Sequence, residues 1–296
     1  MTALGGCGRI DVPYLSLPYT RLMTSRPLRP IVIAAALILA SASIALAHDL
    51  FLKADTYFIA PNSIAKLTAL NGTFSKSEGS VTRDRLIDLA IVGPSGRAKG
   101  DTSTWSEKGN ASHWTPKVGA TGTYVLGASL KPRIIALEAK QFNEYLASDG
   151  LPDILAARKA SGELGTKSRE RYSKHVKALV QAGDAHTASF GTVLGYPAEI
   201  VPLSNPYETK ATLRVRALVD GAPMAGQVVI AGGRTPSGAR LAEQTVRTDA
   251  QGVASIAVTA RGVWYVKFIR MVKIPASAKD SVDYESKWAT MTFEIR

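Results

Sequence analysis

The sequence predicts a mainly β protein that consists of two β-sandwich domains, with a helical insertion in or after the first. Two observations lead to this prediction. Short runs of alternating apolar and polar residues, separated by turn sequences, occupy residues 48–131 and 211–296, which is typical of antiparallel sandwiches. Between residues 135 and 183 the apolar residues instead recur at helical spacing, which favours helices there.

Composition excludes several classes of protein. The chain has 296 residues, of which 46% are hydrophobic, a single cysteine and a formal net charge of +12. A disordered tail protein would have fewer apolar residues, and a disulfide scaffold would be shorter and rich in cysteine. The densest basic run, residues 167–177, falls on an expected helix, where a solvated face is the simpler interpretation. No nucleic-acid-binding motif is present, so no nucleic-acid partner is expected.

Residues 1–47 have the pattern of a signal peptide. An apolar run at 31–40 follows two arginines and precedes small residues that end at Ala47. This order predicts cleavage between Ala47 and His48, and therefore a periplasmic or secreted protein with no stable membrane insertion after cleavage. An uncleaved membrane anchor is the alternative interpretation of the same run.

Cleavage at this point would also remove Cys7, which is the single cysteine. The exported chain would then depend on core packing without a disulfide, and thiol nucleophiles and cysteine metal sites are excluded. The leader is long if translation starts at Met1, whereas a start at Met23 gives a signal peptide of ordinary length.

The N-terminal domain is expected to span residues 48–200. Its first strands alternate apolar and polar residues. An Asn-Gly dipeptide and clusters that contain Pro or Gly separate these strands. Strands are expected at 50–52, 57–59, 65–69, 86–92 and 123–126, and turns at 61–63, 71–72, 93–96 and 119–122.

The helical insertion is expected at about 135–183. Its first helix ends at Asp149, and Pro152 opens the second, since proline is favoured in the first turn of a helix. A third helix is expected at 168–181, with an apolar stripe formed by Tyr172, Val176, Leu179 and Val180.

The C-terminal domain is expected to span residues 201–296, after a proline-containing link at 196–210. Its alternating runs predict a Greek-key sandwich of the immunoglobulin or transthyretin type. Trp264 alternates with Val266 in one of these runs and is expected to face the core. The glycine-rich segment 231–234 is expected to be a plain turn, since it has no third glycine and no helix after it.

The usual catalytic signatures are absent from the sequence. It contains no G-x-x-x-x-G-K-S/T, H-E-x-x-H or G-x-S-x-G pattern, each of which places a particular chemistry on a particular turn or helix. A protein without catalytic activity and without an organic cofactor is therefore expected.

The four histidines carry the functional signal. His48 would become the first residue of the exported chain, where its α-amine and imidazole can chelate copper or nickel together. His113 and His186 are the candidates for a second ligand, because no closely spaced histidine pair exists and the fold must assemble any site. His175 borders the apolar stripe of the third expected helix and is interpreted as a hydrogen-bonded packing residue.

Several blocks of the chain resemble a known family. AHDLFLKADTYF, LNGTFSKSE, GYPAEIVPLSNPY and DYESKWATMTFEI are similar to a family of exported two-domain proteins of unknown function, which is related to NikM, the periplasmic-facing component of nickel uptake systems. The resemblance implies β-sandwich domains, an envelope location and metal handling, with His48 as the matching N-terminal ligand. Arg270 stands before Met271 where many relatives have a His-Met pair, so a ligand from the C-terminal domain is not implied.

Two functional hypotheses follow. The first is a periplasmic protein that binds or delivers a nickel or copper ion through His48, with a membrane metal-uptake system or another envelope protein as partner. The second is a non-enzymatic envelope module that binds protein or glycan, for which an exposed apolar or aromatic patch near Trp288 or the helical insertion is expected.

Overall fold

The computed structural model describes residues 48–209, 211–278 and 281–296. The expected signal peptide, its cleavage site and both candidate start residues lie at or before residue 47, outside the described residues. Within those ranges, no helix combines the length and apolar character needed to cross a membrane. The chain is mostly β, with several sheets packed in a sandwich-like arrangement, which confirms the expected fold class.

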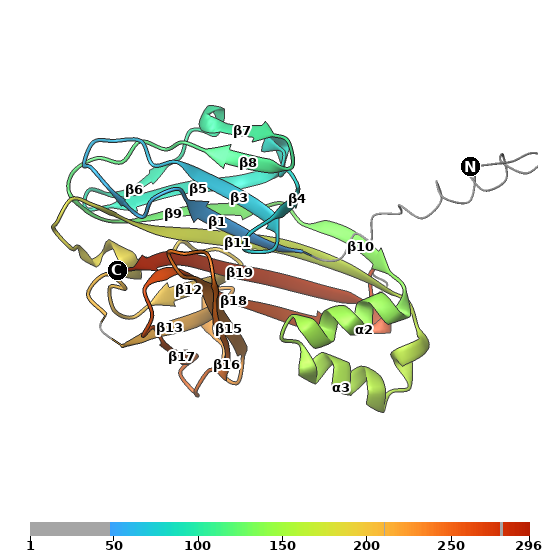
Figure 1. Ribbon diagram of the computed structural model, residues 1–296. Coiled ribbons are helices and arrows are strands. Elements are labelled where there is room, and N and C mark those ends of the chain that lie inside the picture. Colours follow the sequence, from blue (N-terminus) through green and yellow to red (C-terminus); the bar gives the residue numbers. More distant parts are fainter. Residues whose placement is uncertain (1–47, 210, 279–280) are drawn as a thin grey trace, which may run out of the picture. The chain divides into compact units, whose positions relative to one another are not determined.

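A ten-stranded sheet runs through the described chain (Figure 1). Its main path has the order β16–β15–β18–β19–β11–β9–β5–β6, and β10 and β2 both pair with β11. The strands are β16 (Arg240–Arg247), β15 (Val228–Arg234), β18 (Gly262–Lys273), β19 (Tyr284–Ile295), β11 (Ser168–Ala182), β9 (Gly122–Leu130), β5 (Leu86–Gly93), β6 (Gly96–Lys99), β10 (Arg133–Leu137) and β2 (Phe58–Ile59).

A five-stranded sheet covers one face of the N-terminal part. Its path is β1–β3–β8–β7, and β4 pairs with β3. Buried apolar residues of β1, β3 and β8 pack against those of β9 and β11, which forms one hydrophobic core. The strands are β1 (Asp49–Ala54), β3 (Leu67–Gly72), β4 (Ser77–Gly79), β7 (Trp105–Lys108) and β8 (Ala111–Trp114).

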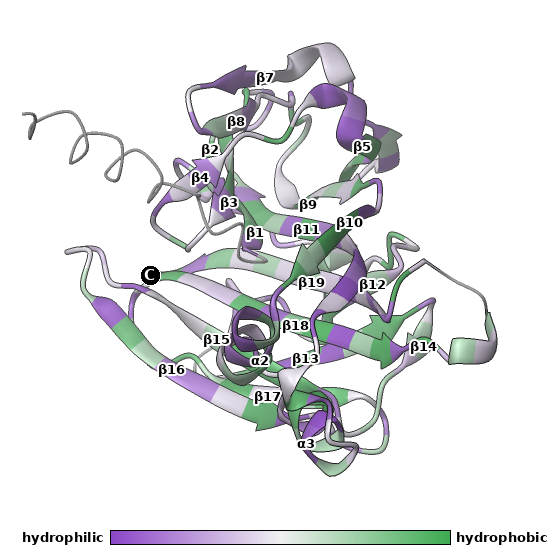
Figure 2. Cartoon of the chain, turned by 90° about the vertical axis from the view of Figure 1, so that its right-hand side faces the viewer, coloured by the Kyte–Doolittle hydropathy of each residue, from purple (hydrophilic) through white to green (hydrophobic). Residues whose placement is uncertain are grey.

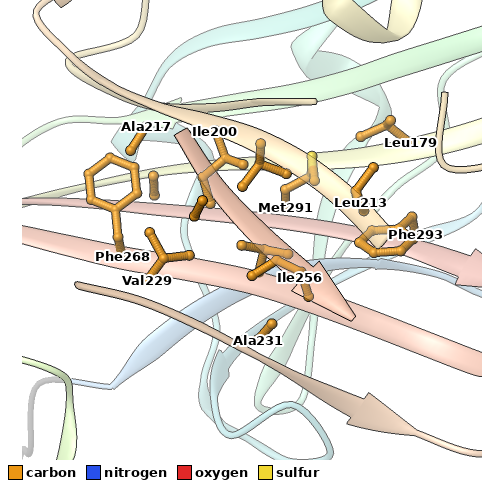
Figure 3. Packing of buried hydrophobic residues seen from close by; sticks show 14 of the residues in the cluster. Leu179, Ile200, Leu213, Ala217, Val229, Ala231, Ile256, Phe268, Met291 and Phe293 are labelled. Carbon is orange, nitrogen blue, oxygen red and sulfur yellow. The ribbon is translucent and has the colours of Figure 1, made fainter. Parts of the chain in front are cut away.

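A four-stranded sheet encloses a second core. It consists of β12 (Ala198–Pro202), β13 (Thr212–Val219), β14 (Ala222–Pro223) and β17 (Val253–Ala257). Its apolar residues pack against β15, β18 and β19, and Trp264, expected to face the core, is buried there. Figure 3 shows Leu179, Leu213 and Phe293 together in this cluster. The edge strand β16, by contrast, is largely exposed and alternates hydrophilic and hydrophobic residues along its length (Figure 2).

The expected third helix is wrong, because residues 168–182 form β11. This strand lies in the middle of the ten-stranded sheet, antiparallel to β9 and parallel to β19. Its two faces belong to different cores: Val176 and Val180 join one, and Leu179 joins the other. A strand buried on both faces loses the period of two, and its apolar residues can then mimic helical spacing.

The two preceding helices are confirmed. Helix α2 (Ala139–Ser148) starts at a capping box in which Glu138 and Gln141 satisfy each other's backbone N–H groups, and α3 (Pro152–Ala160) has proline in its first turn. These arrangements stabilise helix starts because the first N–H groups have no partner within the helix. A third apolar cluster joins α2 to β18 and β19, with Phe142 and Tyr145 beside Trp288.

The boundary expected between residues 200 and 201 lies inside β12. The ten-stranded sheet contains β5, β9 and β11 from before this point and β15, β16, β18 and β19 from after it. The described residues, from His48 onward, accordingly belong to one compact unit. Segments on both sides of the expected boundary can therefore contribute to one site.

Candidate functional site: a cleft at the start of the first strand

A cleft of about 500 Å³ opens beside the first described residue, His48. Three parts of the chain form its walls: the start of β1 with the turn between β3 and β4, the end of α2, and the strands β15, β16 and β18. The volume is in the usual range for small-molecule sites. At this cleft, Lys267 of β18 in the ten-stranded sheet reaches Asp49 of β1 in the five-stranded sheet, 218 positions away in sequence.

His48 stands at the margin of this cleft, with its side chain about one-fifth exposed. Its Nε2 lies 2.7 Å from Oε2 of Glu78. Its backbone carbonyl accepts a hydrogen bond from Nζ of Lys174, which also donates to Oδ1 of Asn71 at 2.9 Å. Burial lowers the pKa of Lys174 to about 8. The residue before β1 is therefore held from both its side chain and its backbone.

A buried charged triad forms the inner end of the cleft. Nζ of Lys267 lies 2.6 Å from Oδ2 of Asp49 and 2.9 Å from Oδ1 of Asp149. Burial raises the pKa of Asp49, whereas Lys267 lowers it less strongly. Burial alone would lower the pKa of Lys267, but the two carboxylates outweigh it and the pKa is raised. Oδ1 of Asp49 is buried without a hydrogen-bond partner among the described residues, which agrees with the raised pKa of this carboxyl.

Three aromatic rings line the cleft between its two ends. The rings of Phe51, Phe74 and Tyr265 lie with centroids 4.9 to 5.2 Å apart. The hydroxyl of Tyr265 donates to Oε2 of Glu243 at 3.0 Å. Gly232 makes room for this ring, because a Cβ atom there would lie 2.6 Å from the Tyr265 hydroxyl oxygen.

Two arginines line the cleft on the side of β15 and β16. Nε of Arg234 donates to Oγ of Ser75 at 3.0 Å, and its Nη1 donates to the carbonyl of Gly238 at 3.1 Å. Arg240 is exposed. In the part of the chain that the structure describes, neither guanidinium forms an ion pair with a carboxylate.

The structure does not bring His113 to His48. His113 pairs with Thr68 on β3, and its Nδ1 lies 3.3 Å from the Thr68 hydroxyl. Asp49 pairs with Gly72 on the other side of β3, four residues further along, which is about 13 Å of strand. His113 is therefore outside the cleft.

His186 also lies apart from the cleft. Its Nδ1 is 3.2 Å from Oε1 of Glu208, beyond the C-terminal end of β11. Lys174, which contacts His48, is eight residues before that end, about 26 Å along the strand. Among the described residues, no group of three or more His, Cys, Asp or Glu side chains could hold a metal ion.

His175 is a packing residue, although in a strand and not in the expected helix. It is buried, with Nδ1 2.9 Å from Oγ of Ser129 and Nε2 3.0 Å from Oγ of Ser173. Burial lowers its pKa to about 4. Trp288 itself cannot belong to the expected exposed patch, because its side chain is 2% exposed and stacks on Tyr145.

Sequence reasoning missed most residues of the cleft. Asp149 was expected only as a helix stop, and segment 231–234, expected as a turn, is the end of β15, where the pairing with β16 shifts register. One signal was present. Lys267 stands between the core residues Val266 and Phe268, so it points to the opposite face of the strand. A lysine there is a candidate for a buried ion pair, but its partners are distant in sequence.

The fold and the cleft define a mainly β protein with one continuous central sheet and a charged, partly aromatic cleft. The chain belongs to the DUF4198 family, a domain of unknown function, whose family model matches residues 45–271. No curated protein matches it significantly.

Matches among solved structures have low sequence identities and low TM-scores. Dimeric latent PorU from Porphyromonas gingivalis is 10% identical, with 84% of this chain and 20% of that chain covered and a TM-score of 0.20. Trypsin-activated alpha-2-macroglobulin from Escherichia coli is 11% identical, with 84% and 16% covered and a TM-score of 0.23. A two-domain fibronectin type III segment of chicken tenascin is 12% identical, with 74% and 87% covered and a TM-score of 0.18. The chain thus spans a fifth or less of the first two proteins.

Proposed function

We propose that this protein is an exported, non-enzymatic protein that binds or delivers a transition metal ion, nickel or copper, at His48. The observation that supports the proposal most directly is the position of His48 at a cleft, 2.7 Å from the carboxylate of Glu78 and next to Asp49. If cleavage occurs after Ala47, the α-amine of His48 becomes a further nitrogen ligand at the same point.

The donor set fits a late first-row metal. Imidazole and amine nitrogens bind nickel and copper well, and a carboxylate can complete the set. Glu78 already contacts the imidazole, and Oδ1 of Asp49 is buried without a partner among the described residues. The proposed second ligand is therefore the carboxylate of Glu78, which lies beside His48, in place of His113 or His186, which lie elsewhere in the fold.

The resemblance to the relatives of NikM supports the same function. It suggests that the protein works in the periplasm beside a membrane metal-uptake system, from which it receives metal or to which it delivers metal. The family assignment alone leaves this role open, so the relationship to NikM is part of the proposal.

The test is a nickel and copper titration of metal-free protein that begins at His48, measured by calorimetry. A second protein carries an acetyl group on the α-amine of His48, which removes the amine as a ligand while leaving the imidazole. We expect acetylation to weaken binding by about tenfold or more, because one nitrogen ligand is lost. His48→Ala should abolish binding, and Glu78→Gln should weaken it.

His113→Ala and His186→Ala are matched controls, because both residues are histidines outside the cleft. Neither substitution should change the affinity. Equal binding by the proteins with and without the acetyl group, or loss of binding in either control, would contradict the proposal.

A further inference from the structure

The cleft has room for a ligand of its own. Its volume is about 500 Å³, which is in the usual range of sites for small organic molecules. The side chains of His48 and Glu78 meet at its margin. A ligand inside the cleft would therefore be bound by other residues than those of the proposed metal site.

Several charged groups inside the cleft are already engaged with one another. Nζ of Lys267 binds the carboxylates of Asp49 and Asp149, at 2.6 and 2.9 Å. One carboxylate oxygen of Glu243 accepts a hydrogen bond from the hydroxyl of Tyr265 at 3.0 Å. A ligand gains more from groups whose donors have no partner, because no existing hydrogen bond has to be broken.

Such donors belong to two arginines that stand opposite each other. Arg234 on β15 and Arg240 on β16 are partners in the antiparallel ladder, so their side chains leave the same face with Cβ atoms about 5 Å apart. Arg240 is exposed and forms no side-chain hydrogen bond or ion pair with the described residues. Arg234 uses its Nε and Nη1 groups for Ser75 and Gly238 and keeps its Nη2 group for a ligand.

This pairing of like charges is unfavourable without a counter-charge. Among the described residues, no carboxylate lies within ion-pair distance of either guanidinium. Lys53 is close enough to feel the same field, since repulsion from Arg234 adds to burial in lowering its pKa. An anion between the two arginines would remove the repulsion and accept charge-assisted hydrogen bonds from both.

The turn between β3 and β4 adds two hydroxyl donors to this side of the cleft. Oγ of Ser75 accepts the hydrogen bond from Arg234. Oγ1 of Thr73 accepts hydrogen bonds from the backbone N–H groups of Ser75 and Lys76. Both hydroxyl residues line the cleft. Because their oxygens already act as acceptors, their protons remain to be donated, and an anion can accept them.

The aromatic lining indicates what the anion carries. Phe51, Phe74 and Tyr265 offer apolar ring surface to the cleft. An inorganic anion gains nothing from this surface, whereas a carbon body is stabilised by leaving water. Glu243 and Asp149 also line the cleft, and they would repel a doubly charged head group more strongly than a singly charged one. A carboxylate on an apolar body meets both conditions.

We propose that the cleft binds a small organic monocarboxylate with an apolar body. The carboxylate lies between the guanidinium groups of Arg234 and Arg240, and the carbon body lies against the rings of Phe51, Phe74 and Tyr265. No metal takes part in this binding. The inference goes beyond the function proposed for His48 and does not depend on it.

The experiment is equilibrium dialysis of protein that begins at His48 against radiolabelled phenylacetate and octanoate, with EDTA present. We expect at least one of these carboxylates to be retained at about one molecule per protein, with a dissociation constant below about 1 mM. The matched ligands are phenylacetamide and octanamide, which lack the charge, and acetate, which lacks the apolar body. Each should bind at least about tenfold more weakly than the retained carboxylate.

Arg240→Gln should weaken retention of the carboxylate by about tenfold, since one charge-assisted pair is lost. Arg240→Lys should lose less, because it keeps the charge but not the paired donors. Without ligand, Arg240→Gln should unfold at the same or a higher urea concentration than the unmodified protein, because repulsion from Arg234 is removed. Arg133→Gln, at an exposed position on β10, is the matched control and should retain the carboxylate like the unmodified protein.

Three results would overturn the inference: neither carboxylate is retained, an amide is retained as well as its carboxylate, or Arg240→Gln leaves retention unchanged. Retention that appears only when nickel replaces EDTA would also contradict it, because the carboxylate would then bind through the metal. The nickel titration without carboxylate tests the proposed function separately, so that failure of one proposal leaves the other standing.

Discussion

Asp49 and Lys267 form an ion pair with Oδ2 and Nζ 2.6 Å apart, although 218 positions separate them in sequence. Their side chains are only 13% and 8% exposed. The pair joins the first strand of the fold to β18, and Asp149 at the end of α2 shares the same ammonium group. One lysine therefore connects the three walls of the cleft.

Replacement of this lysine should be costly. Lys267→Met leaves Asp49 and Asp149 facing each other without a counter-charge, so we expect a loss of about 3 to 5 kcal/mol in the free energy of unfolding. Urea denaturation at neutral pH measures it. Lys287→Met is the control, because its partner Asp220 is 62% exposed and such pairs contribute about 1 kcal/mol or less. Similar losses of unfolding free energy in the two variants would show that Asp49 and Asp149 do not depend on the charge of Lys267.

Glu170 predicts an unusual pH dependence. It is fully buried, and burial raises its pKa from 4.5 to about 7, more than its hydrogen bonds from Ser286 and Tyr145 lower it. Between pH 4.5 and 7, the folded state thus keeps a proton on Glu170 that the unfolded state has lost. The stability linked to this group is present below pH 4.5 and is lost as pH rises through 7, a change of about 3 kcal/mol.

Glu170→Gln removes this titration. The unfolding free energy of the variant, relative to that of the unmodified protein, should therefore be about 3 kcal/mol higher at pH 8 than at pH 4. Parallel urea denaturation series at the two pH values give the comparison. A difference between the two proteins that stays constant with pH would show that Glu170 titrates normally.

His175 predicts the opposite sign. Burial lowers its pKa from 6.5 to about 4, with a smaller contribution from Lys287. Between pH 4 and 6.5 the unfolded state therefore binds more protons than the folded state. The stability linked to neutral His175 is present above pH 6.5 and is lost as pH falls through 4. The unfolding free energy of His175→Gln, relative to that of the unmodified protein, should therefore be about 3 kcal/mol higher at pH 4 than at pH 7. Denaturation at both pH values tests this, and a variant that loses stability on acidification as steeply as the unmodified protein would contradict it.

Gly232 allows a direct test of the aromatic wall. A Cβ atom there would lie 2.6 Å from the Tyr265 hydroxyl oxygen, so Gly232→Ala must displace the ring or the strand. We expect a loss of about 1 to 3 kcal/mol in unfolding free energy, which urea denaturation measures. Gly165→Ala is the control, since nothing lies within 4 Å of a Cβ atom at that position, and it should leave the unfolding free energy unchanged. Equal stability of Gly232→Ala and the unmodified protein would mean that the ring of Tyr265 can move away from position 232 without cost.

The local patterns of the chain predict much of the fold. The alternating runs gave correct strands at β1, β3, β5, β9, β13 and β18, and the capping residues of α2 and α3 indicated both helices. They failed at β11, because a strand that is buried on both faces has no polar side to reveal its period.

The candidate site was predicted in part. The targeting pattern indicates His48, and the structure places this residue at a cleft of about 500 Å³. The surroundings are not predictable from the sequence, because Asp149 and Lys267 meet Asp49, the neighbour of His48, only in the folded chain.

By itself, the sequence determined the β character of the chain, its two helices and the residue on which the functional proposal rests. These features depend on short-range periodicity, capping and composition. Only the tertiary structure decided that one sheet joins the two expected domains, that the three candidate histidines stay apart, and that carboxylates and arginines meet in one cleft. The reason is physical: strand register and ion pairing connect residues far apart in the chain, and no local pattern encodes which distant strands become neighbours.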